Sequence, residues 1–187
     1  MRVLNVCETA RGGVGIYQRN MNGLQDYGIE LQYLLPTQDA DMLGEGAVHY
    51  TFDRPKRSVG AVRSMLREFS RLLRQNDPEL LFFHSSLSLL CLAFLRVSGD
   101  KRPAIYCPHG WAGTTYDDMP MAALIVQLVE ARLCGLADLS ICVSQHERRF
   151  AEERNYKGNF KVIESGVPDA AFDARSNLCD SALRPLN

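Results

Sequence analysis

A glycine-rich segment follows the first apolar run of the chain. Gly12, Gly13 and Gly15 come after "MRVLNVCE" and open a run with helical spacing, "GIYQRNMNGLQDYG". Glycines permit positive φ and close packing, and the free amides of a helix start favour an anion such as phosphate. A dinucleotide fingerprint is not met, because its third glycine would fall at Gln18 and the next apolar run ends in "QYLLP" without an acidic residue. The glycines therefore indicate a tight turn, alone or facing a phosphate.

Two histidines end apolar runs further along the chain. His84 follows "ELLFF", and His109 follows "AIYC" within "CPHGWAG". One histidine at such a place is often a structural hydrogen-bond partner, but two beside a glycine loop form the polar cluster expected in a binding cleft. The loop after His109 is rich in side chains that suit a sugar ring, although they also suit a packed loop: Trp111, Tyr116, Asp117 and Asp118.

Other polar patterns have simpler explanations. Ser144 with Glu147 three residues later is typical of a capping box at a helix start, although it also looks like a nucleophile near a histidine. Four arginines recur along one predicted helix, at 63, 67, 71 and 74. They favour a solvated face, with contact to an anionic membrane or phosphate as the alternative. The cysteines and histidines lack the spacing of metal ligands, so no metal site is predicted.

Elements that would position these residues alternate along the chain. Short apolar runs predict strands at 2–7, 29–36, 48–52, 79–86, 103–110, 139–144 and 160–168. Helical spacing predicts helices at 15–28, 58–75, 87–97, 121–136 and 145–155. Runs such as "LLFF" are continuously apolar, which fits strands covered on both faces. The sequence therefore predicts an α/β fold, a three-layer α/β/α sandwich with a doubly wound, mostly parallel, Rossmann-like sheet, in which ligands bind at the carboxyl ends of the strands.

Composition narrows the class of protein. The 187 residues suffice for one domain with a sizeable core, and the net charge of −1 gives no electrostatic reason to expect nucleic acid as a partner. Six cysteines lie mostly in apolar runs without a Cys-x-x-Cys pair, which favours buried thiols in a cytosolic protein over disulfides. We expect neither a signal segment nor a membrane span, because the chain opens on a strand and its longest uncharged stretch, 80–95, is too short to cross a bilayer.

Five segments, in order, resemble the N-terminal domain of family 4 glycosyltransferases, which are retaining enzymes of the GT-B fold. They are the glycine loop with its helix and strand, two strands that each deliver a histidine, a strand followed by a helix, and a crossover segment. In this sequence they occupy residues 12–36, 78–86, 104–110, 137–150 and 160–172. The resemblance covers residues 1 to about 173 and implies the N-terminal half of a GT-B fold.

The resemblance also implies a reaction and roles for particular residues. The reaction is transfer of a sugar from a nucleotide-sugar donor to a glycan or lipid-linked acceptor, without a cofactor, in polysaccharide or lipopolysaccharide synthesis. By position, Gly13, Val14 and Gly15 would lie near the donor phosphates. His109 would be catalytic, bonding the transferred sugar near the reaction centre, and His84 would line the acceptor side. The next residues of the second histidine segment, Gly110 and Trp111, would also bind substrate.

The chain departs from the family pattern at its end. The family's second domain carries a Glu-x₇-Glu stretch that holds the donor, and no two glutamates here have that spacing. We therefore expect an acceptor-binding domain at 1–170, a tail at the interdomain crossover at 171–187, and no catalytic C-terminal domain. Such a chain would be inactive alone and could self-associate through the exposed interdomain face. The crossover also has Glu164-Ser165 where the family usually has Pro-Asn.

Three hypotheses remain open from the sequence. The first is this half of a cytoplasmic glycosyltransferase, which could lie peripheral to the inner membrane. The alternative is a non-catalytic Rossmann-like module that binds a glycan, lipid or protein partner. The third, a nucleotide-dependent oxidoreductase, is disfavoured by the missing fingerprint. If His109 binds substrate, we expect it to be partly exposed, with at least one ring nitrogen free of protein partners.

Overall fold

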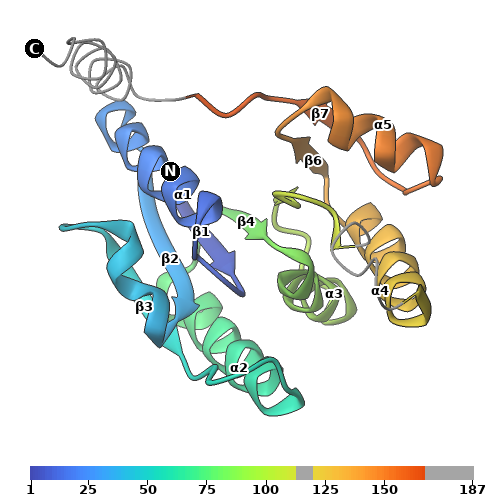
Figure 1. The fold of residues 1–187 in the computed structure, drawn as a ribbon. Helices are drawn as coiled ribbons and strands as arrows, with labels where there is room; N and C mark the ends of the chain where they lie inside the picture. Colours follow the sequence, from blue (N-terminus) through green and yellow to red (C-terminus); the bar gives the residue numbers. More distant parts are fainter. Residues whose placement is uncertain (113–119, 167–187) are drawn as a thin grey trace, which may run out of the picture.

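Parallel strands form a single sheet at the centre of the fold (Figure 1). The computed structural model describes residues 1–112 and 120–166, and in this part of the chain the sheet has seven strands in the order β3-β2-β1-β4-β5-β6-β7. The strands are β1 (Arg2–Cys7), β2 (Glu30–Pro36), β3 (Val48–Phe52), β4 (Leu80–His84), β5 (Ala104–Cys107), β6 (Leu139–Cys142) and β7 (Phe160–Val162). All the predicted strands form, and the predicted doubly wound α/β sheet is confirmed.

Helices cover both faces of this sheet (Figure 1). They are α1 (Gly13–Met21), α2 (Val59–Asn76), α3 (Leu89–Val97), α4 (Pro120–Leu133) and α5 (Gln145–Glu153). On one face, Val14 and Tyr17 of α1 pack against a buried cluster that includes Tyr33 and Phe82 of the sheet. On the other face, α2 and α3 bury a larger set of side chains: Met65, Phe69, Leu72, Leu89, Leu92 and Leu95. The continuously apolar strands are thus buried between two helical layers, as their pattern predicts.

The sheet aligns the ends of three strands at one edge. Cys7 of β1 is the Cα partner of His84 in β4, and His84 is the partner of Cys107 in β5. The chain adds β2 and β3 on one side of β1 before it adds β4 on the other, so the winding direction reverses between β1 and β4. In open α/β sheets a crevice forms at such a reversal, beyond the carboxyl ends of the strands.

Two short 3-10 helices depart from the predicted pattern. The helix expected at 15–28 is α-helical only to Met21 and continues as a 3-10 helix, Asn22–Tyr27, which ends at Gly28 with φ 76°. At the transition, the Asn22 amide donates to the Leu43 carbonyl and its oxygen accepts from the Tyr33 hydroxyl. A second 3-10 helix, Thr37–Leu43, follows β2 and is too short to leave an apolar period in the sequence.

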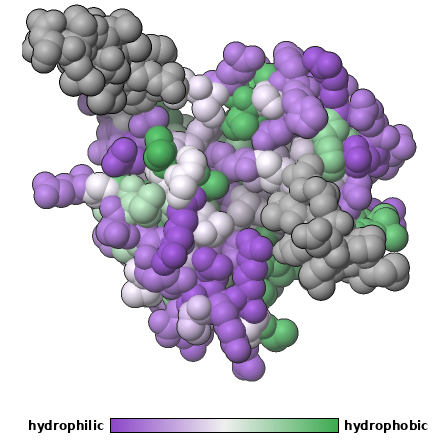
Figure 2. Space-filling model, viewed as in Figure 1, coloured by the Kyte–Doolittle hydropathy of each residue, from purple (hydrophilic) through white to green (hydrophobic). Residues whose placement is uncertain are grey.

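The cysteines and the described helices agree with two predictions made from composition, namely buried thiols and helices that do not cross a membrane. Among the described residues the cysteines are unpaired and buried: Cys7, Cys91, Cys107, Cys134 and Cys142. Cys179 and the 171–187 tail lie outside the described residues. None of the described helices has both the length and the apolar character that a bilayer crossing requires. On the face drawn in Figure 2, apolar side chains gather in small patches between hydrophilic ones.

Candidate functional site

A cleft opens where the sheet reverses direction. It has a volume of about 600 Å³ and combines the loops after β1, β4 and β5 with the start of α2. We call it the switch-point cleft; its lining includes Glu8, Thr9, Val14, Arg57, Ser58, Val59, Val62, Ser85, Ser86, Leu87, Leu90, Pro108, His109, Gly110, Ala112 and Val126. About half of its lining residues are apolar, and its polar groups come from the ends of β1, β4 and β5 and from the segment that leads into α2.

A second hollow lies on the other side of the loop that carries His109. It has a volume of about 860 Å³, and we call it the crossover hollow because residues just after β7 contribute to it. Its lining is Gly13, Val14, Ile16, Tyr17, Asn20, Met21, Leu24, His109, Gly110, Val143, Glu147, Glu164, Ser165 and Gly166. The two hollows share Val14, His109 and Gly110. A group at His109 can therefore meet ligands from both sides.

The glycine loop combines a turn, a packing contact and an exposed helix start. Gly12 has φ +65°, a conformation that side chains with a Cβ rarely adopt. Gly15 is buried, and a Cβ there would lie 2.0 Å from the Ala10 carbonyl oxygen. Gly13 is exposed, and a Cβ on it would meet nothing within 4 Å. Helix α1 has no side-chain cap, so its first amides remain available to an anion beside Gly13.

The structure brings the two predicted histidines into contact. His84 Nδ1 lies 2.9 Å from His109 Nε2, and the rings are stacked with centroids 5.2 Å apart. His109 is partly exposed, as expected, but its other nitrogen, Nδ1, lies 3.7 Å from the Cys107 sulfur. The expectation of a ring nitrogen free of protein partners is therefore wrong, although the thiol contact is long.

His84 occupies a different place from the one expected. It is fully buried, so it does not line the acceptor side but lies behind His109. Burial lowers the pKa of His84 well below its ordinary value, with a smaller contribution from His109. Burial also lowers the pKa of His109, to about 4. Both rings are therefore neutral at physiological pH, and His109 is a hydrogen-bonding group rather than a cation.

Trp111 does not offer its ring to a sugar, which corrects the sequence-based expectation. Its side chain is only 1% exposed and packs edge-on against Tyr156, with centroids 4.6 Å apart. The indole nitrogen donates to the Glu147 carbonyl at 2.8 Å. The ring anchors the loop after β5 to α5, because a buried indole needs both packing and a partner for its N–H. Tyr116, Asp117 and Asp118 lie outside the described residues.

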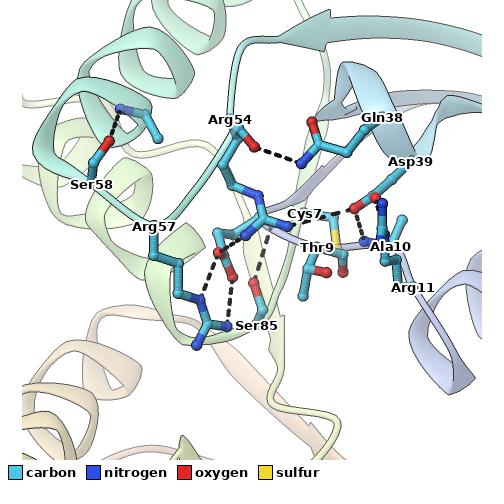
Figure 3. Close-up of polar contacts among 12 residues, drawn as sticks. Cys7, Thr9, Ala10, Arg11, Gln38, Asp39, Arg54, Arg57, Ser58 and Ser85 are labelled. Carbon is cyan, nitrogen blue, oxygen red and sulfur yellow. Dashed lines mark hydrogen bonds and ion pairs between the residues drawn. The ribbon is translucent and has the colours of Figure 1, made fainter.

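The sequence analysis did not identify a group of charged side chains around two buried carboxylates, Glu8 and Asp39, near the end of β1 (Figure 3). The Glu8 carboxylate accepts bonds from Arg54 at 2.8 Å and from Arg57 at 3.0 and 3.2 Å. Arg54 also lies 3.8 Å from buried Asp39, which Arg11 contacts at 2.9 Å. Glu8 directly follows an apolar run, as His84 does. This position at the end of a predicted strand was the signal in the sequence that could have identified Glu8 as a site residue. Its arginine partners come from after β3, and no spacing in the sequence links them to Glu8.

Two more buried carboxylates hold the loop that carries His109. Glu130 of α4 accepts from Ser86, Tyr106 and the Ala112 amide, at 2.6 to 3.0 Å. Burial raises its pKa, and hydrogen bonds from these groups oppose the rise. Glu147 lines the crossover hollow; burial raises its pKa, while backbone hydrogen bonds from Val143 and Gly110 oppose the rise.

The structure supports helix capping by Ser144 and shows how the α2 arginines are exposed. Ser144 caps α5 by accepting from the Glu147 amide at 3.2 Å, and the Glu147 carboxylate accepts from the Val143 amide at 2.8 Å. Glu147 thus both caps a helix and reaches the hollow, which the spacing alone did not reveal. The α2 arginines include three exposed side chains, while Arg71 pairs with Glu68 at 2.8 Å on the same helix. This exposure fits both a solvated face and contact with an anionic surface.

Comparisons with known proteins give a family match and several solved structures of similar fold. The model of the family described as Glycosyltransferase Family 4 matches residues 11–171. Sucrose-phosphate synthase from Thermosynechococcus elongatus superposes with TM-score 0.71 and 15% identity, over 95% of this chain and 53% of that one. HepE from Anabaena in complex with UDP superposes with TM-score 0.65 and 16% identity, over 96% of this chain and 50% of that one. MurG from Acinetobacter baumannii superposes with TM-score 0.57 and 11% identity, over 91% of this chain and 47% of that one.

These likenesses have defined limits. At such identities the superpositions establish the fold, which is that of GT-B glycosyltransferase structures. The chain spans about half the length of each of these three solved proteins. No curated protein matches the chain in sequence.

Proposed function

Because the chain belongs to Glycosyltransferase Family 4, we propose that it forms the acceptor-binding half of an enzyme that transfers a sugar from a nucleotide-sugar donor to an acceptor hydroxyl. One observation supports this most: two hollows of substrate size meet at His109 and share three residues. A transferase must hold two substrates with their reacting atoms together, and one group between two hollows suits this arrangement. We propose 1–170 as this domain and 171–187 as its tail.

The donor is proposed to enter from the crossover hollow. The exposed start of α1 at Gly13 and Val14 offers amides to a diphosphate, whose charge grows as the sugar leaves. Among the described residues that line this hollow are two glutamates, Glu147 and Glu164, and no lysine or arginine. A diphosphate needs more positive charge than this, so the second half of the enzyme must supply most of the donor site.

The acceptor is proposed to occupy the switch-point cleft. Most of its exposed surface is apolar, and Val59 at its edge is 87% exposed. Such a wall stabilises an apolar group rather than a chain of sugars. We therefore favour a lipid-linked acceptor over a free glycan, in polysaccharide or lipopolysaccharide synthesis. Its hydroxyl would lie near His109 and Gly110, and its apolar part along α2 and α3.

A lipid acceptor would be reached from the cytoplasmic side of the inner membrane. Buried free thiols are typical of a reducing compartment. Exposed Arg63 and Arg67 follow the aliphatic edge of the cleft along α2 and would meet anionic headgroups. We expect the chain to cosediment with vesicles that contain anionic lipid and less with neutral ones. Arg63→Gln with Arg67→Gln should weaken this binding, and equal binding to both vesicles would argue against membrane contact.

His109 is the residue whose replacement tests the proposed reaction. Replacement should be made in a protein that joins this chain to a second GT-B domain, since we expect the 187-residue chain alone to be inactive. His109→Ala leaves His84 Nδ1 without its partner, so some loss of stability is expected as well. His109→Gln, whose amide can still donate to His84, should preserve the melting temperature while transfer falls at least about tenfold.

A control variant and the competing hypothesis complete this test. His146→Ala removes an exposed histidine of α5 and should leave transfer unchanged. Wild-type transfer rates in His109→Gln would contradict the proposed role. If the joined protein binds acceptor but never turns over a nucleotide sugar, the non-catalytic binding module becomes the better account. The same assay also tests turnover by the isolated chain.

A further inference from the structure

A chain of side-chain hydrogen bonds runs from the interior of the sheet to His109. Asn5 of β1 donates through Nδ2 to the Gln32 carbonyl at 3.3 Å, and its Oδ1 lies 3.1 Å from His84 Nε2. His84 Nδ1 lies 2.9 Å from His109 Nε2. Asn5 and His84 are both buried, at 1% and 0% exposure, so neither reaches a ligand. They can influence one only through His109.

The hydrogen bond from Asn5 to the Gln32 carbonyl determines which atoms donate and which accept in the bonds that follow. A backbone carbonyl can only accept, so the atom of Asn5 that faces Gln32 must be its amide nitrogen. The amide oxygen then faces His84, and it too can only accept. His84 must therefore carry its proton on Nε2, because two acceptors 3.1 Å apart would repel each other.

The same logic passes from His84 to His109. A fully buried imidazole without a carboxylate partner is neutral, so a proton on Nε2 leaves His84 Nδ1 as an acceptor. His109 must then donate from Nε2. Since burial also keeps His109 neutral, its Nδ1 carries a lone pair. The group facing this nitrogen is the Cys107 thiol, 3.7 Å away, which is a weak donor.

We infer that Asn5 is a positioning residue that acts through His84 to hold His109 in its Nε2–H tautomer, with Nδ1 as an acceptor. A ligand group that meets His109 at Nδ1 must then bring the proton, as a sugar or acceptor hydroxyl does. A phosphate oxygen cannot. This inference rests on the proposed function for the identity of the ligand, but the tautomer itself does not depend on any reaction.

Nitrogen NMR of the 187-residue chain tests the tautomer directly. Long-range ¹H–¹⁵N correlations distinguish a protonated ring nitrogen from a bare one, and His109→Gln assigns the His109 signals. The inference expects Nε2 to be protonated and Nδ1 bare in the wild type at neutral pH. A proton on Nδ1 of His109 would overturn it. Failure of sugar transfer in the joined enzyme would leave this result unaffected, so the two proposals can fail separately.

A pair of variants tests the role of Asn5. Asn5→Leu removes the acceptor that orients His84, so the His109 signals should change from one tautomer to a mixture. Asn22→Leu is a matched control, since Asn22 also donates to a backbone carbonyl and accepts from a side chain, away from the histidines. Unchanged His109 signals in folded Asn5→Leu would contradict the inference. If Asn5→Leu does not fold, the wild-type spectrum still decides whether the tautomer is correct.

Discussion

Gly13 and Gly15, which follow β1, should differ in how much an added side chain changes the free energy of unfolding. A methyl group on Gly15 would overlap the Ala10 carbonyl, whereas one on Gly13 would enter open space at the start of α1. We predict that Gly15→Ala lowers the free energy of unfolding by about 2–3 kcal/mol because backbone must move. Gly13→Ala should raise it slightly, by under about 1 kcal/mol, by restricting the unfolded chain. Urea unfolding of both variants measures this, and equal effects would contradict the packing argument.

The buried histidines should make stability depend on pH. Unfolding returns both pKa values to about 6.5, from about 4 for His109 and from well below the ordinary value for His84. Below pH about 6.5 the unfolded chain therefore binds more protons, and the free energy of unfolding falls as the pH is lowered through about 4. The raised pKa values of Glu130 and Glu147 act in the opposite direction.

A comparison of variants isolates the histidine contribution to this pH dependence. Between pH about 7 and about 4, wild type should lose up to about 3 kcal/mol more than His109→Gln, since each unit of pKa shift is worth about 1.4 kcal/mol. The carboxylates contribute equally to both proteins and cancel in the difference. Parallel curves from chemical denaturation across this range would show that His109 is not desolvated as described.

The sequence identified residues of the site by a positional rule rather than by their contacts. His84 and His109 were found because side chains at the carboxyl ends of parallel strands gather at one edge of the sheet. The same rule could not tell that one would be buried behind the other. For Trp111 the aromatic type suggested a ligand, yet the ring fills the core. Glu8 was missed because its meaning depends on Arg54 and Arg57, which only the folded chain brings near.

At the scale of elements, two helices begin at serine caps that the structure makes visible. Ser58 accepts from the Ala61 amide of α2, and Ser144 accepts from the Glu147 amide of α5, each at 3.2 Å. We predict that alanine at either position lowers the free energy of unfolding by about 1 kcal/mol. Ser98→Ala, at the exposed end of α3, should change it by less than about 0.5 kcal/mol. Thermal unfolding compares the three, and equal losses would refute the capping roles.

Strands and long helices were predictable from the sequence because each leaves a period or a continuous apolar run. The α2 pattern predicted 58–75, and the helix occupies Val59–Asn76. The change from α-helix to 3-10 helix at Asn22 and the 3-10 helix at Thr37–Leu43 left no such signal, because tertiary bonds to Asn22 and Asp39 stabilise them. Strand order and register could not be predicted from these patterns, because no local sequence feature indicates that Cys7 pairs with His84.

At the scale of the whole molecule, the crossover hollow presents an apolar wall to its surroundings. Ile16 and Leu24 from the α1 side line it and are 48% and 37% exposed. A second domain that packs there would cover them. We predict weak self-association of the isolated chain through this wall, seen as a concentration-dependent rise in sedimentation coefficient. Ile16→Ser with Leu24→Ser should reduce it, and Val97→Ser, exposed at the end of α3, should not.

The position of β1 inside the sheet, between β2 and β4, has a kinetic consequence. In residues 1–112 and 120–166 every strand pairing is parallel, so none of these pairs can close through a tight hairpin. Where β1 and β4 meet, Glu8 and Ser85 are in contact across 77 positions of sequence. Contacts this distant make folding slow, on the order of milliseconds to seconds. Until β4 arrives, β1, β2 and β3 can assemble as a half-sheet whose most apolar strand has one open edge. The time spent in that state, rather than the stability of the finished fold, sets the risk of aggregation during synthesis.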